Sequence, residues 1–163
     1  MSTKTNQTYL NRPTAPEMYY TIGQLGGVEG HLDGWPVLLS AGVAYNNPNN
    51  PGGFAIHVPK ASKLMIDSGG FQAATKWDCA YPYRPRELHE WAESLNADVV
   101  AGMDVACETG EALLASGAIK WGLSYTWEER MHLSLRFQRY QRDHYEEAGY
   151  SHAFMPVVQG HNP

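Results

Sequence analysis

The sequence predicts an α/β fold built around a parallel β-sheet. Short apolar runs of strand length alternate along the chain with segments of helical periodicity, which is the pattern of βα units. Three of these runs are followed by polar side chains, as strands are when their carboxyl ends line a binding site. The length of 163 residues suits one ordinary domain with a buried core.

Four apolar runs are the predicted strands, and they cover residues 36–44, 63–67, 97–104 and 153–160. Residues 46–53 are rich in Asn, Pro and Gly, so they predict a surface loop. Residues 1–35 contain many Gly, Pro, Thr and Tyr residues without sustained periodicity. We expect an irregular N-terminal segment there, with short strand pieces.

Two helices have recognisable ends in the sequence. Pro85 suits the first helical position, and apolar residues recur from Leu88 at i, i+3, i+4 and i+7. The longest helix begins near Thr126, where Thr126-Trp-Glu-Glu129 matches a capping box, and Gly149 marks its end. Its apolar residues are expected to trace one face: Leu133, Phe137, Tyr140, His144 and Ala148.

Composition limits the possible functions. The net charge of −5 and the isoelectric point near 5.7 argue against a broadly basic nucleic-acid-binding surface. Two cysteines, Cys79 and Cys107, make no disulfide scaffold, so we expect free thiols. The seven histidines show no metal-binding spacing, and no metal site is expected. With no membrane-spanning run and no secretion signal, we expect a cytoplasmic protein without a membrane partner.

The most informative segment is Asp67-Ser-Gly-Gly-Phe-Gln72, at the end of the second predicted strand. A carboxylate there can accept hydrogen bonds from the ring N–H and amino groups of a guanine-like base. Gly69 and Gly70 carry no side chain, so a flat ligand can approach the backbone, and Phe71 can stack on it. The same residues also suit a plain strand-to-helix turn in which Asp67 caps the helix.

A second carboxylate, Asp104, follows the third predicted strand. Two carboxylates near one base suit guanine, and such a pair pushes its pKa values apart so that one acid can donate a proton. Alternatively, Asp104 caps the helix after its strand. Gln159 and Gly160 end the fourth run, where an amide can read a carbonyl and an adjacent N–H together.

These polar strand ends do not by themselves decide the architecture. In a (β/α)8 barrel the carboxyl ends of the strands face the active site. In an open doubly wound sheet the same edge binds ligands. The residue pattern is compatible with both.

Three of these segments together resemble the tRNA-guanine transglycosylase family, which exchanges a guanine in a nucleic acid for a 7-deazaguanine. The matching pieces are Leu64-Met-Ile-Asp-Ser-Gly-Gly-Phe-Gln72, then Met103-Asp104 with Cys107 close by, then Val157-Val-Gln-Gly160. They occur in the family's order and at similar separations. The cysteine stands one position later than in the bacterial tRNA enzymes, a variation that is similar to the DNA-modifying branch.

The resemblance implies a (β/α)8 barrel of the TIM type. This chain would supply the first half to five-eighths of it, as a single incomplete domain. The resemblance also implies that Asp67 assists proton transfer and contacts the base, and that Phe71 stacks on the base. The other residues that it implies for the base pocket are Ser68, Gly69, Gly70, Asp104, Cys107, Gln159 and Gly160.

Two parts of the family's site have no counterpart in the sequence. Family members attack the ribose C1′ with an aspartate from a later strand, and their zinc site of three cysteines and a histidine also lies later. We therefore expect a truncated or split form without a zinc ion or other cofactor of its own. A second polypeptide, or another copy of the chain, would complete the barrel and cover its open sheet edges.

The first functional hypothesis is a base-exchange glycosyltransferase that acts on tRNA or DNA and takes its nucleophile from a partner. The alternative is a non-catalytic subunit that binds the base or helps to assemble such an enzyme, as in the two-chain eukaryotic version of the family. A third hypothesis is an unrelated barrel enzyme, such as a hydrolase that uses two carboxylates.

Overall fold

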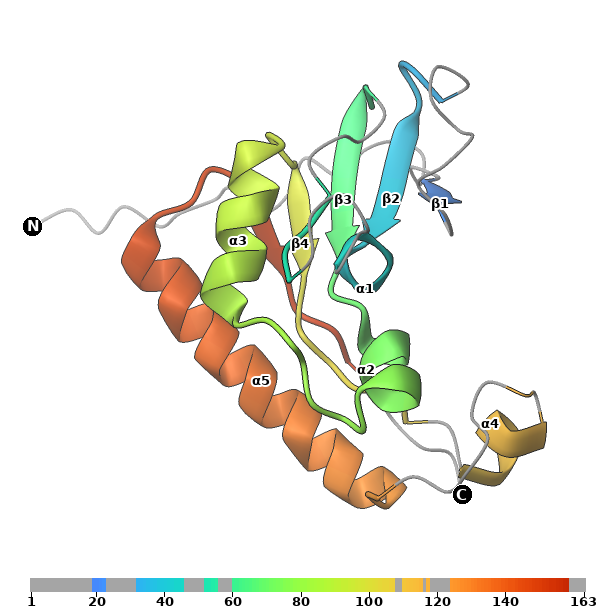
Figure 1. Cartoon of the computed structure of the whole chain (residues 1–163). Coiled ribbons are helices and arrows are strands. Elements are labelled where there is room, and N and C mark those ends of the chain that lie inside the picture. Colours follow the sequence, from blue (N-terminus) through green and yellow to red (C-terminus); the bar gives the residue numbers. More distant parts are fainter. Residues whose placement is uncertain are drawn as a thin grey trace, which may run out of the picture.

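The computed structural model describes residues 19–22, 32–45, 52–55, 60–107, 110–115, 117 and 124–158. These residues form an α/β fold in which five parallel strands make one sheet (Figure 1). The strands are β1 (Tyr20–Ile22), β2 (Pro36–Ser40), β3 (Lys63–Asp67), β4 (Val99–Ala101) and β5 (Ala153–Met155). The helices are α1 (Ala41–Ala44), α2 (Gly70–Lys76), α3 (Pro85–Ser94), α4 (Gly110–Ala115) and α5 (Trp127–Ala148).

The strands follow one another across the sheet in the order of the sequence, and each pairs in parallel with the next. Parallel neighbours need a crossover connection. The crossover from β3 to β4 contains α2 and α3, and the crossover from β4 to β5 contains α4 and α5. α3 and α5 pack against each other, whereas α1 and α2 lie beyond the carboxyl ends of β2 and β3 (Figure 1). The segments that leave β3 and β4 therefore start from the same edge of the sheet.

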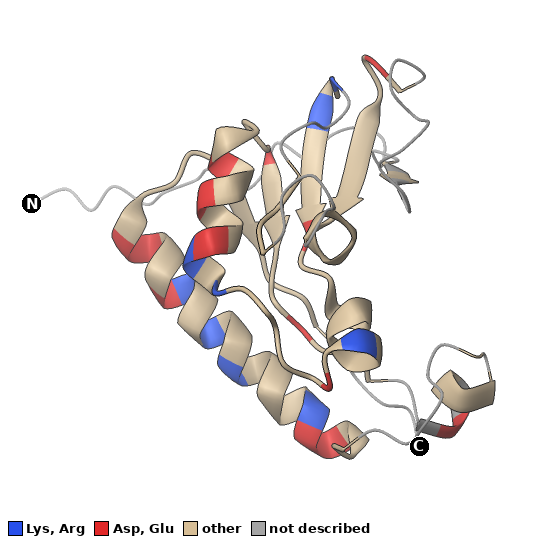
Figure 2. Cartoon of the chain, viewed as in Figure 1, with Lys and Arg blue, Asp and Glu red and all other residues tan. Residues whose placement is uncertain are grey.

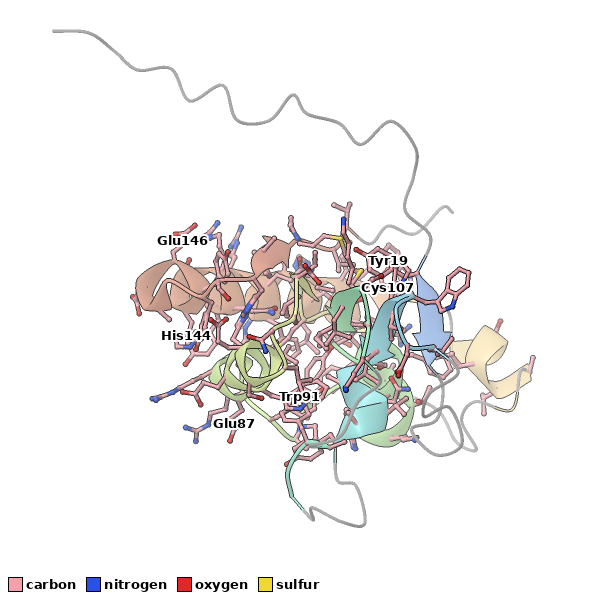
Figure 3. The ribbon with its side chains drawn as sticks, turned by 90° about the horizontal axis from the view of Figure 1, so that it is seen from above. Tyr19, Glu87, Trp91, Cys107, His144 and Glu146 are labelled. Atoms are coloured by element: carbon pink, nitrogen blue, oxygen red, sulfur yellow. The ribbon has the colours of Figure 1, made fainter. Side chains whose placement is uncertain are left out.

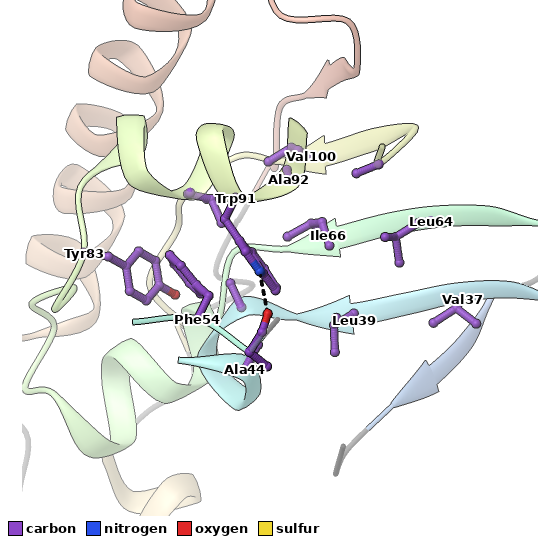
Figure 4. Packing of buried hydrophobic residues seen from close by; sticks show 14 of the residues in the cluster. Val37, Leu39, Ala44, Phe54, Leu64, Ile66, Tyr83, Trp91, Ala92 and Val100 are labelled. Atoms are coloured by element: carbon purple, nitrogen blue, oxygen red, sulfur yellow. Dashed lines mark hydrogen bonds between the residues drawn. The ribbon is translucent and has the colours of Figure 1, made fainter. Parts of the chain in front are cut away.

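The main apolar core lies between the sheet and α3. Along β2 and β3, buried apolar residues alternate with more exposed ones, because successive side chains of a strand point to opposite faces. The buried ones are Val37, Leu39, Leu64 and Ile66. Trp91 of α3 covers them, and its ring stacks on Phe54 with centroids 4.4 Å apart. The Trp91 indole Nε1–H donates a 2.9 Å hydrogen bond to the Ala55 carbonyl, which fixes the ring in the core (Figure 4).

The predicted ends of the two long helices are confirmed. Pro85 is the first residue of α3. At the start of α5, the Glu129 N–H donates a 3.2 Å bond to Thr126 Oγ1 and the Thr126 N–H donates a 2.8 Å bond to Glu129 Oε2. Gly149 ends α5 in the left-handed conformation, with φ of 66°. Local capping chemistry therefore set these boundaries.

Three predicted strands are shorter than their apolar runs. In the run 153–160, β5 ends at Met155, and residues 156–158 are outside any strand. β2 stops at Ser40, and residues 41–44 form the short helix α1. In the run 97–104, only Val99–Ala101 pairs as a strand. The prediction of continuous strands was wrong in all three places, because an apolar run by itself does not separate a strand from a buried helical turn or an extended segment.

The buried face of α5 also differs from the predicted one. Tyr140 lies on the predicted apolar face but is 63% exposed. The residues that α5 buries are polar: Arg130, Ser134 and Gln141. The prediction followed the apolar residues, whereas this helix packs against a segment whose backbone groups need hydrogen-bond partners.

The surface charges are mixed along α5. This helix carries Asp and Glu towards both ends and Arg in its middle (Figure 2). Arg142 forms a 2.7 Å ion pair with Asp143 on the exposed side. Among the described residues, no helix is both long enough and apolar enough to cross a membrane.

Candidate functional site

The exit of β3 places a half-buried carboxylate at the edge of the sheet. Asp67 is the last residue of β3, and its Oδ2 accepts a 3.1 Å hydrogen bond from the Gly69 N–H. The next helix begins after Gly69, which occupies the N-cap position itself. Asp67 therefore stabilises the turn without capping α2, and in the described part of the chain its side chain makes no other hydrogen bond.

Gly69 and Gly70 allow parts of the chain to approach one another. Gly69 has a left-handed φ of +82°, and a Cβ there would lie 2.7 Å from the Gly42 backbone nitrogen. A Cβ on Gly70 would lie 2.5 Å from Asp104 Oδ1. The sequence suggested a flat ligand as the group that approaches these glycines. In the structure, α1 and the segment after β4 occupy that space.

The exit of β4 carries the second carboxylate. Asp104 lies beyond the end of β4 and is 7% exposed. Its Oδ1 accepts a 3.2 Å hydrogen bond from the Ser68 hydroxyl. Because Ser68 directly follows Asp67, this bond brings the two aspartates to the same end of the sheet. Helix α4 does not begin until Gly110, so Asp104 is not its cap.

Two tyrosines from the loop between α2 and α3 hold the exits of β3 and β4 together. The Tyr81 hydroxyl donates to the Asp104 carbonyl and accepts a 3.2 Å bond from the Asp104 N–H. The Tyr83 hydroxyl donates a 2.7 Å bond to the Ser68 carbonyl. The hydroxyls of Tyr81 and Ser68 are 3.3 Å apart. Both exits therefore meet at one small group of hydroxyls.

Burial keeps both phenols protonated. It raises the pKa of Tyr81 well above the usual phenol value, and the charges of Asp104 and Asp67 raise it further, although the bond with Ser68 acts in the opposite direction. Burial also raises the pKa of Tyr83, and Asp67 adds to the shift. A protonated phenol remains a hydrogen-bond donor.

Gln141 of α5 holds the first part of the segment that contains Asp104. Its Oε1 accepts a 2.5 Å bond from the Met103 N–H, and its Nε2 donates a 3.2 Å bond to the Ala101 carbonyl. Gln141 and Met103 are both buried. One side-chain amide therefore satisfies two backbone groups where β4 ends, in place of a neighbouring strand.

Ser134 and Arg130 hold the rest of the same segment. The Val105 N–H donates a 2.8 Å bond to Ser134 Oγ. Arg130 donates a 2.9 Å bond from Nε to the Ala106 carbonyl and a 2.9 Å bond from Nη1 to the Tyr125 carbonyl. The buried polar face of α5 thus runs along residues 101–106 and fixes the position of the Asp104 backbone.

Phe71 and Cys107 occupy different environments. Phe71 lies in the first turn of α2 and is 50% exposed. Cys107 is buried, and its thiol donates a 3.4 Å hydrogen bond to the Val105 carbonyl. Cys79 and Cys107 are both free thiols, as the sequence predicted. Phe71 can therefore reach a ligand from the surface, whereas Cys107 packs beneath the exit of β4.

Gln159 and Gly160 lie outside the described residues. The chain just before them is held by Gln138 of α5, which donates a 2.8 Å bond to the Val157 carbonyl and accepts a 2.8 Å bond from the Val157 N–H. A Cβ on Gly102 would lie 2.6 Å from Gln138 Oε1, so this glycine lets the helix approach. The segment after β5 therefore runs beside α5 as far as Val157.

The sequence left Tyr81 and Tyr83 open as pocket walls or as loop packing, and it did not predict the residues that hold the site. They are Tyr81, Tyr83, Arg130, Ser134, Gln138 and Gln141. One signal was available for part of this set. Ser134, Gln138 and Gln141 stand at i, i+4 and i+7, which places three polar residues on one helical face.

No group of three or more His, Cys, Asp or Glu side chains that could hold a metal ion occurs in the described ranges. Comparisons of the chain with family models, with curated proteins and with solved structures find no match.

Proposed function

We propose that this chain is the base-binding part of a base-exchange glycosyltransferase, which replaces a guanine in tRNA or DNA by a 7-deazaguanine. The sequence resemblance to tRNA-guanine transglycosylases supports this function. The supporting structural observation is that Asp67 and Asp104 lie at the exits of two neighbouring parallel strands, where Ser68, the residue after Asp67, donates a 3.2 Å hydrogen bond to Asp104 Oδ1.

The two acids suit a guanine-like ligand for a chemical reason. The N1–H and the 2-amino group of guanine are hydrogen-bond donors on one edge of the base, and carboxylates are acceptors. Asp67 has acceptor capacity left after its single bond to Gly69. The exposed ring of Phe71 supplies a stacking surface, and stacking on an aromatic ring contributes about 1–3 kcal/mol per base. Gln159 and Gly160 line the rest of the pocket in this proposal.

The exchange takes place at the ribose C1′. The bond between C1′ and guanine N9 breaks while a carboxylate from outside these 163 residues bonds to C1′. N9 of the incoming deazaguanine then attacks C1′ from the face that guanine left, the bond between C1′ and the carboxylate breaks, and N9 loses its proton. Asp67 carries protons to the leaving base and from the incoming one. The target base leaves its stack first, which costs a few kcal/mol that the pocket contacts offset.

We propose that the sheet is part of a (β/α)8 barrel. A doubly wound sheet reverses its strand order at a switch point, whereas the described strands run in sequence order without a reversal. The sheet face opposite the buried core residues carries partly buried apolar side chains: Leu38, Met65 and Val99. In a closed barrel this face lines the interior. A second polypeptide or another copy of the chain completes the barrel.

Light scattering coupled to size exclusion tests this assembly. The isolated chain is expected to self-associate, or to need a partner for solubility, because the partly buried face and the sheet edges remain uncovered. A stable, soluble monomer would contradict the assembly without affecting base binding.

One observation favours the alternative of a non-catalytic base-binding subunit. Asp104 is nearly buried and is bonded to Ser68, so it is better placed to orient a base than to exchange protons with one. Guanine exchange by the isolated chain would exclude this alternative. Exchange that appears only when a nucleophile-bearing chain is added would leave a split enzyme or a binding subunit.

Calorimetric titration of the chain with guanine and with 7-deazaguanine tests the function itself. We expect both to bind, and we expect Asp67→Asn to raise the Kd about 10- to 100-fold, since a hydrogen bond to a charged group contributes about 1.5–3 kcal/mol. Asp143→Asn, which changes an exposed acid on α5, is the matched control and should leave the Kd unchanged. Equal affinity for adenine, or no purine binding at all, would contradict the proposed function.

A further inference from the structure

A cluster of stacked rings joins α3, α5 and the start of β5, away from the exits of β3 and β4. Its centre is His89 of α3 and His152, which directly precedes β5. The two imidazole rings are buried and lie edge to edge in nearly parallel planes, with centroids 5.0 Å apart and an interplanar angle of 6°. Tyr145 and Tyr150 contact both rings. His144 lies between α5 and α3, with its ring 6.4 Å from that of His89 (Figure 3).

The charge on Glu93 determines which atom donates in each hydrogen bond between His89, His152 and Glu93. His152 Nδ1 lies 3.0 Å from Glu93 Oε2, and His152 Nε2 lies 2.7 Å from His89 Nδ1. Bonds from Ser151 and His152 lower the pKa of Glu93, so this carboxylate is charged and accepts. His152 must then carry its proton on Nδ1 and present a bare Nε2. His89 must donate to that nitrogen from its own Nδ1.

The far end of this chain of bonds has no partner. His89 Nε2 is buried and makes no hydrogen bond within the described part of the chain. In the tautomer fixed by Glu93 it is unprotonated. A proton added there would be a buried charge without an acceptor, which is strongly unfavourable.

Protonation of either histidine disrupts the bonds. If His152 takes a second proton, both of its nitrogens donate, and His89 must move its own proton to the partnerless Nε2. If both histidines are charged, two N–H groups face each other across 2.7 Å. Burial, followed by the charges of His152 and His144, lowers the pKa of His89 to about 4. Burial also lowers the pKa of His152, although Glu93 acts in the opposite direction.

Other titratable groups face the pair from each packed element. Glu93 faces it from α3, and Tyr145 and His144 face it from α5. Tyr150 stacks on His89 and is itself near two charged residues of α3: Arg86 and Glu90. Of these groups, only Glu93 favours a proton on the pair, and it acts on His152 alone.

β5 depends on this cluster for its position. It is a three-residue edge strand that pairs with β4 in the described sheet. Its first backbone bond, from the Ala153 N–H to the Asp98 carbonyl at 2.9 Å, comes directly after His152. The Tyr145 hydroxyl donates a 2.6 Å bond to the His152 carbonyl. A loss of the His89–His152 contact therefore acts on the end of a very short strand.

We propose that Glu93, His152 and His89 form an acid-sensitive latch, which fastens β5 to α3 at neutral pH and releases it in acid. The latch does not require the proposed base-exchange function. Both histidine pKa values lie below the unfolded value of 6.5, so the open form binds more protons. The latch is complete above pH 6.5 and is lost as the pH falls towards about 4. Its opening would also loosen the segment after β5, which Gln138 holds at Val157.

Amide hydrogen exchange measured by NMR, corrected for the intrinsic pH dependence of exchange, tests the latch. The Ala153 and Gly102 amides report the pairing of β4 with β5, and the Asp98 amide, bonded to the Leu64 carbonyl, reports the neighbouring β3–β4 junction. Between about pH 7 and about pH 4.5, the protection of the first two should fall about 10- to 100-fold relative to Asp98. If the protection of Ala153 and Gly102 relative to Asp98 were the same at both pH values, the latch would be overturned.

The variant His89→Phe keeps an aromatic ring in the cluster and removes the hydrogen bond between His89 and His152. Its Ala153 and Gly102 amides should lose the acid response, whereas His132→Gln, an exposed histidine of α5, should keep it. An unchanged acid response in His89→Phe contradicts the latch. If this variant does not fold, imidazole nitrogen shifts of the unmodified chain decide. Protons on Nδ1 of both rings support the latch, and any other pair of tautomers overturns it.

Discussion

The chain leaves β3 and β4 through two segments that each bring an aspartate to the carboxyl edge of the sheet. Asp67 is half-buried, and its side chain makes a single described bond, to the Gly69 amide. Asp104 is almost buried, its carboxylate accepts a bond from Ser68, and both of its backbone groups bond to Tyr81. The comparison shows one acid with capacity for a ligand and a second acid whose position is set by the fold.

The difference arises from the segment after each strand. β3 passes almost directly into α2, whose own hydrogen bonds satisfy the backbone. Residues 102–107 form neither helix nor strand, so their backbone groups need other partners. Helix α5 supplies these partners through a polar face. The fixed position of Asp104 is therefore a consequence of an extended exit that runs beside a helix.

The largest expected effect comes from removing the main support of the β4 exit. Gln141→Ala leaves the Met103 N–H and the Ala101 carbonyl buried without a partner, so the free energy of unfolding should fall by about 2–5 kcal/mol. Gln138→Ala is the matched control, because it removes two similar bonds at the more exposed Val157 and should cost about 1–2 kcal/mol. Urea denaturation measures both. Equal losses would mean that burial does not distinguish the two sites.

The two aspartates themselves give the next effect. Asp104→Ala should lower the free energy of unfolding by about 1–3 kcal/mol, because the buried Ser68 hydroxyl loses its acceptor. Asp67→Ala should cost about 0.5–1 kcal/mol, because the Gly69 amide can turn to water. Thermal or denaturant unfolding of the two variants measures the difference. A greater loss for Asp67→Ala would reverse the comparison.

Substitution of the two tyrosines also distinguishes the β4 exit from the β3 exit. Tyr81→Phe removes the partner of the Asp104 carbonyl and N–H and should cost about 1–2 kcal/mol. Tyr83→Phe removes the partner of the Ser68 carbonyl alone and should cost about 0.5–1.5 kcal/mol. Guanine affinity should fall in both variants, and it should fall more in Tyr81→Phe than in Tyr83→Phe. If Tyr83→Phe lowered the free energy of unfolding more than Tyr81→Phe, the β3 exit would depend more on its tyrosine than the β4 exit does.

The smallest effect on stability belongs to Phe71. Because its ring is 50% exposed, Phe71→Ala should change the free energy of unfolding by less than about 0.5 kcal/mol. The same variant should weaken guanine binding about 5- to 100-fold, since the stacking surface is lost. Calorimetric titration gives the affinity, with Leu135→Ala on exposed α5 as the control. An unchanged affinity would remove Phe71 from the proposed pocket.

Helix ends could be predicted because local capping chemistry decides them, and the parallel sheet could be predicted because apolar runs alternate with helical segments. Thr126 and Glu129 cap α5 through bonds to their own backbone, and Pro85 starts α3 without needing a distant partner. The partners of the polar face of α5 could not be predicted in this way. Gln141 bonds to residues about forty positions earlier, and nothing near it in the sequence identifies them. Hydrogen bonds to backbone groups far away in the sequence determine which face of α5 is buried.

The candidate site could also be predicted only in part. The position of Asp67 at the end of β3 follows from an apolar run that stops at a carboxylate. The Asp104 backbone is held by Tyr81, which the loop between α2 and α3 brings from elsewhere in the chain. The sequence indicated space for a ligand at the glycines, whereas Gly70 makes room for Asp104. A sequence pattern identifies residue types at strand ends, but tertiary packing decides which of them remain open to a ligand.

Carboxyl-carbon NMR shifts of the aspartates, followed during titration with guanine, test the proposed base-binding site most directly. The resonances of Asp67 and Asp104 should both move and saturate together, with the larger change at the more accessible Asp67, while Asp33 and Asp143 stay unchanged. If neither strand-end aspartate responds, or if distant acids respond equally, the two exits do not form one base-binding site.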